Sequence, residues 1–407
     1  MSELFPDAEL YGLVAGRPEN ELLLLCAHRG GGAEAAARVG ELARGGVDWD
    51  YLYALARRHA LLPMLYRGLA GLAVSAPERF REELRVRFRE NATRNVLLAG
   101  ELARVARLFE SEGVGLLAYK GPALAVQAYG DLSLRRFVDL DVIVRRRDVA
   151  RAGELLLSLG FAKPAGLTAS HESFLLRRQH NLAFSGGGGR LTIELHWEVS
   201  PAPFASVPLG GDAWARASSV TLNGVTVKCL APEDLLLALA VHGTKHLWGR
   251  LAWVCDVAAL VNSCPSLDWD FVLRRARDSR VERMLYLALR LARGLLGARL
   301  PDAALEGAGD APASRLAAEA ASALFRGAGD ELSGLVRSVR FNMRARGRLR
   351  EKAAYLGFIF TPTHGDLAAV SLPAGASFLY YLLRPLRLAL KGEDGRPKSA
   401  RITRGTA

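Results

Sequence analysis

Two aspartates stand two residues apart in an otherwise apolar segment, Val138-Asp139-Leu140-Asp141-Val142-Ile143-Val144. The β-branched, alternating pattern predicts a strand, in which residues two apart point to the same face. Asp139 and Asp141 would then project side by side, and two buried carboxylates repel each other and lose their hydration. A divalent cation such as Mg²⁺, which prefers oxygen ligands, relieves both costs. The alternative is a solvated strand edge, or ion pairs with Arg135 and Arg136.

A third carboxylate lies in a later alternating segment, Leu191-Thr192-Ile193-Glu194-Leu195-His196-Trp197-Glu198. This strand is predicted to form a hairpin with the strand that begins at His180, around Gly186–Gly189. Glu194 and His196 share the polar face, so Glu194 could join the two aspartates across a sheet. It would complete a metal shell or act as general base. His180 and His196 are predicted to line the wall of the same site.

Candidate phosphate ligands surround this acidic strand. Lys120-Gly121 follows a short apolar strand and precedes a helix beginning at Pro122, where free N–H groups and the helix dipole favour an anion. Arg135 and Arg136 could grip phosphate oxygens in a bidentate fork. Metal-assisted phosphoryl or nucleotidyl transfer is predicted by three features together: the turn at Lys120-Gly121, the strand with Asp139 and Asp141, and the later strand with Glu194.

A second group of titratable residues lies further along, in His242-Gly243-Thr244-Lys245-His246. The two histidines share one helical face with the spacing of zinc ligands, but the Glu of the His-Glu-x-x-His motif is missing. A hydrogen-bond network with Asp256 is one alternative to zinc. The other is that Lys245 or His246 faces a phosphate or an acceptor.

The order of these motifs resembles the polymerase-β-type nucleotidyltransferase superfamily. Several segments are more closely similar to the uncharacterised bacterial nucleotidyltransferase family found in biosynthetic gene clusters, including those of lasso peptides. They are Tyr119-Lys120-Gly121, Arg135 through Asp141, Ile193 through Trp197, and His242 through Trp248 with Trp253 and Asp256. Thr361-Pro362-Thr363 with Asp366, and Leu383-Arg384-Pro385, also match, so the resemblance covers roughly residues 50–390.

This resemblance implies an α+β fold: a polymerase-β-like core of mixed sheet and helices, flanked by N-terminal and C-terminal helical regions. It implies a two-metal Mg²⁺ site on Asp139, Asp141 and Glu194, with a nucleoside triphosphate as donor. The phosphates would be held by Lys120, Gly121, Arg135, Arg136 and Lys245, and the site wall would include His180, His196, His242, His246 and Asp256. The acceptor would be a small molecule or peptide, as in natural-product tailoring.

One position departs from the superfamily pattern: the Ser that follows the Gly is Pro122 here. Either Lys120 replaces the phosphate contact of that Ser, or the triphosphate binds differently. Two other functions stay open. One is a non-catalytic nucleotide-binding or scaffold protein, whose nucleotidyltransferase fold has lost its activity. The other is an RNA-directed nucleotidyltransferase.

The flanking segments read as helical, and five regions are predicted: an N-terminal helical region 1–110, a catalytic core 111–230, a helical domain closing the active site 231–300, a C-terminal helical region 301–390, and a disordered basic tail 391–407. Within them, 301–313 is predicted to be a linker and Thr221–Cys229 a strand with Asn223-Gly224 as its turn. His59, at a predicted helix end, is expected to be a capping or core histidine.

Composition narrows the class of protein. The chain has 407 residues, of which 50% are hydrophobic, which excludes wholesale disorder. The net charge is +12, and residues 331–407 hold 14 basic against 5 acidic residues, but no basic motif of a known nucleic-acid reader occurs, so nucleic acid is the less favoured partner. The four cysteines form no Cys-x-x-Cys pair, and no apolar run approaches a membrane span. With an acidic start in place of a signal peptide, we expect a cytoplasmic protein.

Overall fold

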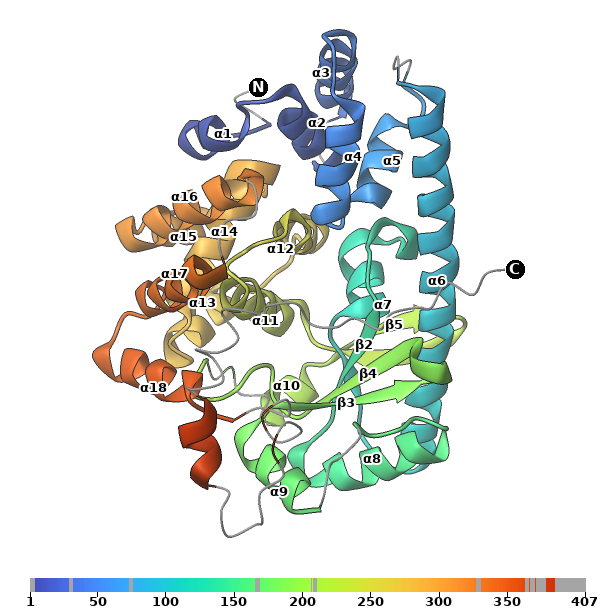
Figure 1. Cartoon of the computed structure of the whole chain (residues 1–407), viewed down its shortest axis with the longest axis vertical. Coiled ribbons are helices and arrows are strands. Elements are labelled where there is room, and N and C mark those ends of the chain that lie inside the picture. The colour runs from blue at the N-terminus through green and yellow to red at the C-terminus, as the bar shows by residue number, and fades with distance from the viewer. Residues whose placement is uncertain are drawn as a thin grey trace.

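A six-stranded mixed sheet carries the acidic segment at its centre (Figure 1). The computed structural model describes residues 4–28, 32–72, 76–164, 169–205, 207, 211–326, 331–362, 366, 370 and 378–384. The strands are β1 (Leu117–Ala118), β2 (Asp139–Ile143), β3 (Asn181–Gly186), β4 (Leu191–His196), β5 (Ser218–Leu222) and β6 (Val225–Cys229). Their order is β3-β4-β2-β1-β6-β5; β2–β4 and β1–β6 are parallel and the other pairs antiparallel.

Helices precede and follow the sheet in the chain. The N-terminal ones are α1 (Ala8–Val14), α2 (Pro18–Ala27), α3 (Gly32–Arg44), α4 (Trp49–Arg58), α5 (Leu62–Leu69) and the long α6 (Glu78–Ser111). Between the strands lie α7 (Gly121–Leu124), which continues as a π-helix over Ala125–Tyr129, α8 (Val149–Ser158), α9 (Ala169–Arg178) and α10 (Gly211–Ala215). The last are α11 (Pro232–Lys245), α12 (Leu251–Ser263), α13 (Trp269–Asp278), α14 (Glu282–Leu296), α15 (Asp302–Ala308), α16 (Ala311–Phe325), α17 (Glu331–Arg344) and α18 (Leu349–Ile359). The predicted α+β class is therefore confirmed.

Strand alternation divides the hydrophobic residues into two cores, one on each face of the sheet. Leu140 and Val142 of β2, with Ile193 and Leu195 of β4, pack in the core that contains the C-terminal half of α6 and α8. The opposite face, which carries Ile143, belongs to the core of the N-terminal helices and α11–α16. Because Asp139 and Asp141 have the parity of Ile143, they face the helices α11 and α12, which lie in the middle of Figure 1.

Helix α11 is apolar on all sides because it lies inside the second core. Every residue of Leu235–Val241 is at most 4% exposed, and the helix packs against α12, α13 and α14. A helix that is hydrophobic all round is expected to be buried in this way. His59 is likewise buried: it caps α4, and its Nδ1 accepts a hydrogen bond from the Leu251 N–H at 3.1 Å, as expected for a capping and core histidine.

Two local predictions were wrong. Thr221–Cys229 is not one strand but part of the β5–β6 hairpin, since Asn223 (φ 49°) and Gly224 (φ 76°) both take the left-handed conformation of a tight turn. The predicted linker 301–313 consists instead of α15 and the start of α16. Ala304 and Ala308 lie four apart on the buried side of α15, which packs on α14, and Asp310 caps α16 by accepting from the Ala313 N–H.

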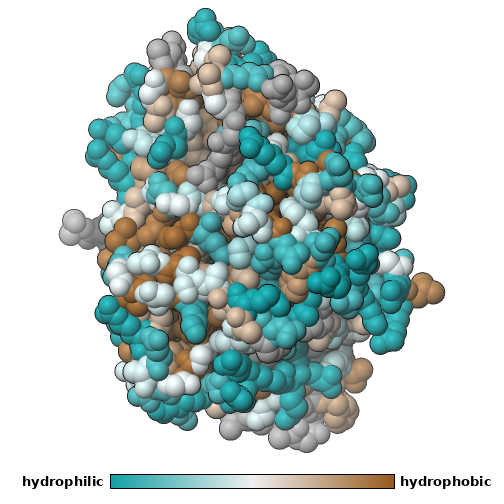
Figure 2. Space-filling view, turned by 180° about the vertical axis from the view of Figure 1, so that it is seen from behind, coloured by the Kyte–Doolittle hydropathy of each residue, from teal (hydrophilic) through white to brown (hydrophobic). Residues whose placement is uncertain are grey.

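The surface seen from behind carries hydrophilic side chains over most of its area, with hydrophobic ones in smaller groups between them (Figure 2). Among the described residues, no helix has both the length and the apolar character needed to cross a bilayer. The predicted basic tail 391–407, together with Thr363 and Pro385 of the family segments, lies outside the described residues.

Candidate functional site

The parallel pairing of β2 with β4 places two acids directly opposite each other. Asp141 pairs in register with Glu194, and Asp139 pairs with Thr192. All four residues lie on the same face of the sheet, with His196 two residues beyond Glu194. Two separate stretches of sequence therefore bring three carboxylates to one surface.

The carboxylate of Asp141 is held by two nitrogen donors. Lys120 Nζ lies 2.7 Å and His196 Nε2 3.1 Å from Asp141 Oδ1, and His196 Nε2 is also 3.2 Å from Glu194 Oε2. Asn181 on β3 donates from Nδ2 to Glu194 Oε2 at 2.8 Å. Asp141 and His196 are buried, whereas 13% of the Lys120 side chain and 31% of the Glu194 side chain are exposed. The cluster is therefore anchored in the protein on one side and open on the other.

These contacts set the protonation of the cluster. Burial alone would raise the pKa of Asp141, but Lys120 and His196 outweigh it and hold that pKa well below its usual range. The hydrogen bond from His196 lowers the pKa of Glu194. Burial works against charge on His196, yet Asp141 and Glu194 raise its pKa above the ordinary value. Asp139 differs: burial first, and the charge of Asp141 second, raise its pKa.

The donor set fits a divalent metal ion. Among the described residues, Asp141, Glu194 and His196 form the one group whose ligand atoms lie within 4.8 Å of one another. The two carboxylates suit Mg²⁺ or Mn²⁺, whereas the imidazole is a ligand typical of Zn²⁺. Asp139 lines the same cavity without belonging to this group, and the predicted two-metal set of Asp139, Asp141 and Glu194 stays a prediction. His196, expected only in the site wall, lies within the group.

The cluster forms part of the floor of a cavity of about 530 Å³. Its walls come from the β1–α7 turn, the segment before β2, the strands β3 and β4, and the α11–α12 turn. Of the predicted site residues, those that line it are Lys120, Arg135, Arg136, Asp139, Asp141, His180, Glu194, His196, His242, Lys245 and His246. Gly121 and Asp256 do not line it.

The turn predicted to hold phosphate has another structural role here. Gly121 has φ +54°, and a Cβ on it would lie 3.3 Å from the Asp139 carbonyl oxygen, so glycine allows the turn to pass under β2. Lys120 directs its ammonium to Asp141, and Pro122 occupies the first turn of the four-residue α7. The turn therefore has Pro122 where the superfamily has Ser, and its lysine is already paired with Asp141.

Arg135 is engaged by a buried acid. Its Nε and Nη2 donate to the two oxygens of Asp256 at 2.9 and 3.0 Å, and Tyr129 Oη donates to the same carboxylate at 2.8 Å. The Asp256 side chain is only 2% exposed. This fork joins the segment before β2 to α12. Arg135 and Tyr129 are therefore the partners of Asp256, whereas the sequence offered His242 as one alternative for that role.

The helical wall carries aromatic rings and cations. The rings of His242 and His246 lie 4.8 Å apart, and each centroid is 5.4 Å from that of Trp253. Burial, and then Lys245, lower the pKa of His246 to about 4, and burial lowers that of His242 well below its ordinary value. Both rings are therefore neutral at pH 7 and available for packing against a planar group.

Sequence reasoning missed Arg250; it placed His180-Asn181 in the site wall but did not foresee the hydrogen bond from Asn181 to Glu194. Asn181 pairs with His196 in the β3–β4 register, so its side chain has the parity that reaches Glu194. The hairpin prediction contained that signal. Arg250, which lines the cavity, precedes the first residue of α12, and its place depends on how the chain turns after α11; no sequence pattern marks it.

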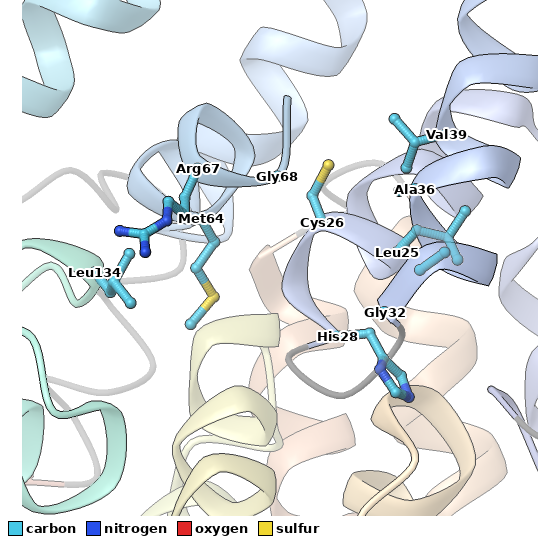
Figure 3. A pocket seen from close by; sticks show the side chains of 11 residues that line it. Leu25, Cys26, His28, Gly32, Ala36, Val39, Met64, Arg67, Gly68 and Leu134 are labelled. Carbon is cyan, nitrogen blue, oxygen red and sulfur yellow. The ribbon is translucent and has the colours of Figure 1, made fainter. Parts of the chain in front are cut away.

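A second cavity, of about 320 Å³, lies between α2, α3 and α5 (Figure 3). Leu25, Ala36 and Val39 line one side, and Met64 and Leu134 the other, with the Cys26 thiol between them. Burial raises the pKa of that thiol to about 12, so Cys26 is not a nucleophile at neutral pH. The described residues that line this cavity include His28 and Arg67 but no carboxylate, so they offer no acid–base pair.

Comparison with known proteins assigns the chain to a family. Residues 45–297 match the model of the family described as "Uncharacterised nucleotidyltransferase", and the chain belongs to that family. No curated protein matches the chain. One solved structure, an antigenic nucleotidyltransferase-like protein from Paracoccidioides brasiliensis, is similar over 46% of this chain and 91% of its own, with 15% sequence identity and a TM-score of 0.28.

Proposed function

We propose that the protein is a magnesium-dependent nucleotidyltransferase that moves a nucleotidyl group from a nucleoside triphosphate to a small-molecule or peptide acceptor, as in natural-product tailoring. The observation that carries the proposal is the pairing of Asp141 with Glu194 on adjacent parallel strands, within a cavity lined by cations. Membership of the nucleotidyltransferase family supports it. A cavity of about 530 Å³ is in the range that small-molecule ligands occupy.

The chain's own residues divide the work by position. Asp141, Glu194 and His196 would hold the cation, which supplies charge stabilisation at the phosphoryl oxygens and orients the in-line displacement. Asn181 fixes Glu194 by a hydrogen bond, so that the carboxylate keeps one orientation toward the cavity. Asp139 and Glu194 are the acids exposed enough to accept the proton of an acceptor hydroxyl.

The test is label transfer. The full chain is incubated with Mg²⁺, α-labelled ATP, CTP, GTP or UTP and candidate acceptors, and label in the acceptor is measured together with released pyrophosphate. We expect transfer from at least one nucleotide, and its loss in Asp141→Asn and Glu194→Gln. Transfer that persists in Asp141→Asn would contradict the proposal.

A non-catalytic nucleotide-binding protein is the second candidate, and a specific observation favours it. Lys120 places a cation on Asp141, and Pro122 replaces the Ser of the superfamily pattern. Such a protein would bind nucleotide with an affinity independent of Mg²⁺ and release no pyrophosphate with any acceptor.

The RNA-directed alternative is less favoured, because three arginines in the C-terminal basic segment contact protein groups: Arg344 pairs with Glu319, Arg346 donates to the Phe204 carbonyl, and Arg384 pairs with Asp366.

A further inference from the structure

A triphosphate is a compact polyanion and needs cationic side chains that the protein has not already neutralised. Two of the cations predicted for this task from the sequence, Lys120 and Arg135, are already paired with acids. Lys120 is 2.7 Å from Asp141, and Arg135 is held by both oxygens of Asp256. Gly121 itself does not line the cavity, and the helix that follows it has only four residues. The polyphosphate therefore requires other partners.

Three more cations line the cavity: Arg136, just before β2, and Lys245, at the end of α11, which were both predicted to hold phosphate, and Arg250, just before α12. We call these three residues the cationic wall. None of them has an ion pair or a side-chain hydrogen bond with an acid in the part of the chain that the structure describes. An array of this kind is what an anionic ligand would complete.

Neighbouring positive charges act on two residues of the cationic wall, Arg136 and Lys245. Burial, and then the neighbouring guanidinium groups of Arg94 and Arg250, lower the pKa of Arg136. Burial, and then Lys120, lower the pKa of Lys245. Arg94 reinforces the group from α6, where its Nη2 donates to the Phe137 carbonyl at 3.0 Å. Like charges held together in this way are relieved by a bound anion.

The turn between α11 and α12 fixes two of the three residues of the cationic wall. Leu247 (φ 54°) and Trp248 (φ 53°) both adopt the left-handed conformation, which is costly for residues other than glycine. Trp248 is fully buried, its N–H donates to the Gly243 carbonyl at 2.8 Å, and its indole packs where a Cβ on Gly243 would stand. This anchor holds the strained turn and sets the positions of Lys245 and Arg250 on either side of it.

We propose that Arg136, Lys245 and Arg250 bind the polyphosphate of the donor nucleotide without the help of a metal ion, from the helical side of the cavity that holds Asp141 and Glu194. The identification of the ligand as a donor nucleotide rests on the proposed function. A bound polyphosphate would then connect the sheet to the α11–α12 turn, so that donor binding links the two halves of the cavity.

The test is calorimetric titration of the full chain with inorganic tripolyphosphate in buffer containing EDTA. We expect binding by the wild type and an affinity about tenfold weaker in Lys245→Gln and in Arg250→Gln, since each removes one charge-assisted contact. Lys228→Gln on β6 and Arg274→Gln on α13 remove exposed cations elsewhere and should leave the affinity unchanged. Equal affinities for the wild type and both cationic-wall variants, or no binding by the wild type, would overturn the proposal.

Two further experiments distinguish a nucleotide from a nucleic acid as the phosphate ligand, and the failure of this proposal from the failure of the proposed function. A single-stranded RNA without a 5′-triphosphate should compete poorly; if it displaces tripolyphosphate at lower concentration than ATP does, the wall reads a nucleic-acid backbone and the nucleotide assignment is wrong. Asp141→Asn should keep tripolyphosphate binding in EDTA. If the wild type binds tripolyphosphate through the wall but transfers no label to any acceptor, the proposed function fails while the binding site stands.

Discussion

Asp139 and Asp141 share one face of β2, yet only Asp141 has a cation on its carboxylate, the ammonium of Lys120 at 2.7 Å. The two acids are therefore opposite in electrostatic character. The pKa of Asp141 is held far down by Lys120 and His196, whereas that of Asp139 is raised by burial and by Asp141. Ionised Asp141 contributes to the stability of the metal-free fold, and ionised Asp139 opposes it.

This asymmetry predicts opposite effects of two matched substitutions. Above pH 5 in EDTA, Asp139→Asn should raise the midpoint of urea unfolding, because it removes a repelled charge. Asp141→Asn should lower it, since Lys120 is left buried without its partner. Urea unfolding followed by circular dichroism measures both. A pair of variants that shift in the same direction would show that the carboxylates are equivalent.

The fork between Arg135 and Asp256 predicts a structural role for both residues. Asp256→Asn should cost about 3 kcal/mol of unfolding free energy, because it leaves a buried guanidinium without its counter-charge. Tyr129→Phe, which removes one hydrogen bond to the same carboxylate, should cost about 1 kcal/mol. Chemical denaturation checks both values. If instead Asp256→Asn keeps its stability and loses nucleotide affinity, Arg135 belongs to the binding site.

His59 predicts a specific loss of stability in acid. Burial first, and then the charge of Arg58, lower its pKa to about 4, against about 6.5 in the unfolded chain. The unfolded state therefore binds the extra proton first, so stability is lost as the pH falls from about 6.5 to 4, by up to about 3 kcal/mol. Asn in its place can keep an acceptor for the Leu251 N–H. The unfolding free energy of His59→Asn should vary less across this range than that of the wild type; parallel curves would refute a neutral buried His59.

Gly243 predicts a link between core packing and the cationic wall. A Cβ at this position would lie 2.5 Å from the Trp248 indole, which the surrounding core holds in place. Gly243→Ala should therefore cost about 1–3 kcal/mol and displace the α11–α12 turn. Tryptophan fluorescence and tripolyphosphate affinity should change together. Gly249→Ala is the matched control, since its Cβ would meet only the His246 carbonyl, at 3.4 Å.

Much of the fold could be predicted from the periodicity of the sequence. The alternation in 138–144 and 191–198 gave strands whose acids share a face, and the structure pairs Asp141 with Glu194 in register. The hairpin predicted around Gly186–Gly189 is the β3–β4 pair, because a run of glycines separates two segments with strand patterns. The prediction of a linker at 301–313 is wrong. A segment rich in Ala, Gly and Pro is typical of a linker, but Ala is also a strong helix former, and Ala304 and Ala308 pack on a neighbouring helix.

The partners of the charged groups could not be predicted. Whether Lys120 meets a phosphate or Asp141, and whether Arg135 meets a phosphate or Asp256, depends on which segments tertiary packing brings together. Lys120 follows β1 and Asp141 lies in the neighbouring strand β2, but Asp256 comes from a helix more than a hundred residues beyond Arg135. The spacing of residues in the sequence predicts which face of a strand or helix a side chain is on. It does not predict which residue from a distant segment packs against that side chain.

The central claim is that Asp141 and Glu194 bind a divalent cation together with a nucleoside triphosphate. Paramagnetic resonance of free Mn²⁺ tests it most directly, by titrating the chain with Mn²⁺ in the presence of ATP, CTP, GTP or UTP. The account predicts that the wild type depletes the free Mn²⁺ signal, beyond depletion by nucleotide alone, with at least one nucleotide. Asp141→Asn and Glu194→Gln should weaken this binding about tenfold or more, and His59→Asn should not. A wild type that binds no Mn²⁺ with any nucleotide, or an Asp141→Asn variant that binds it equally well, would contradict the account.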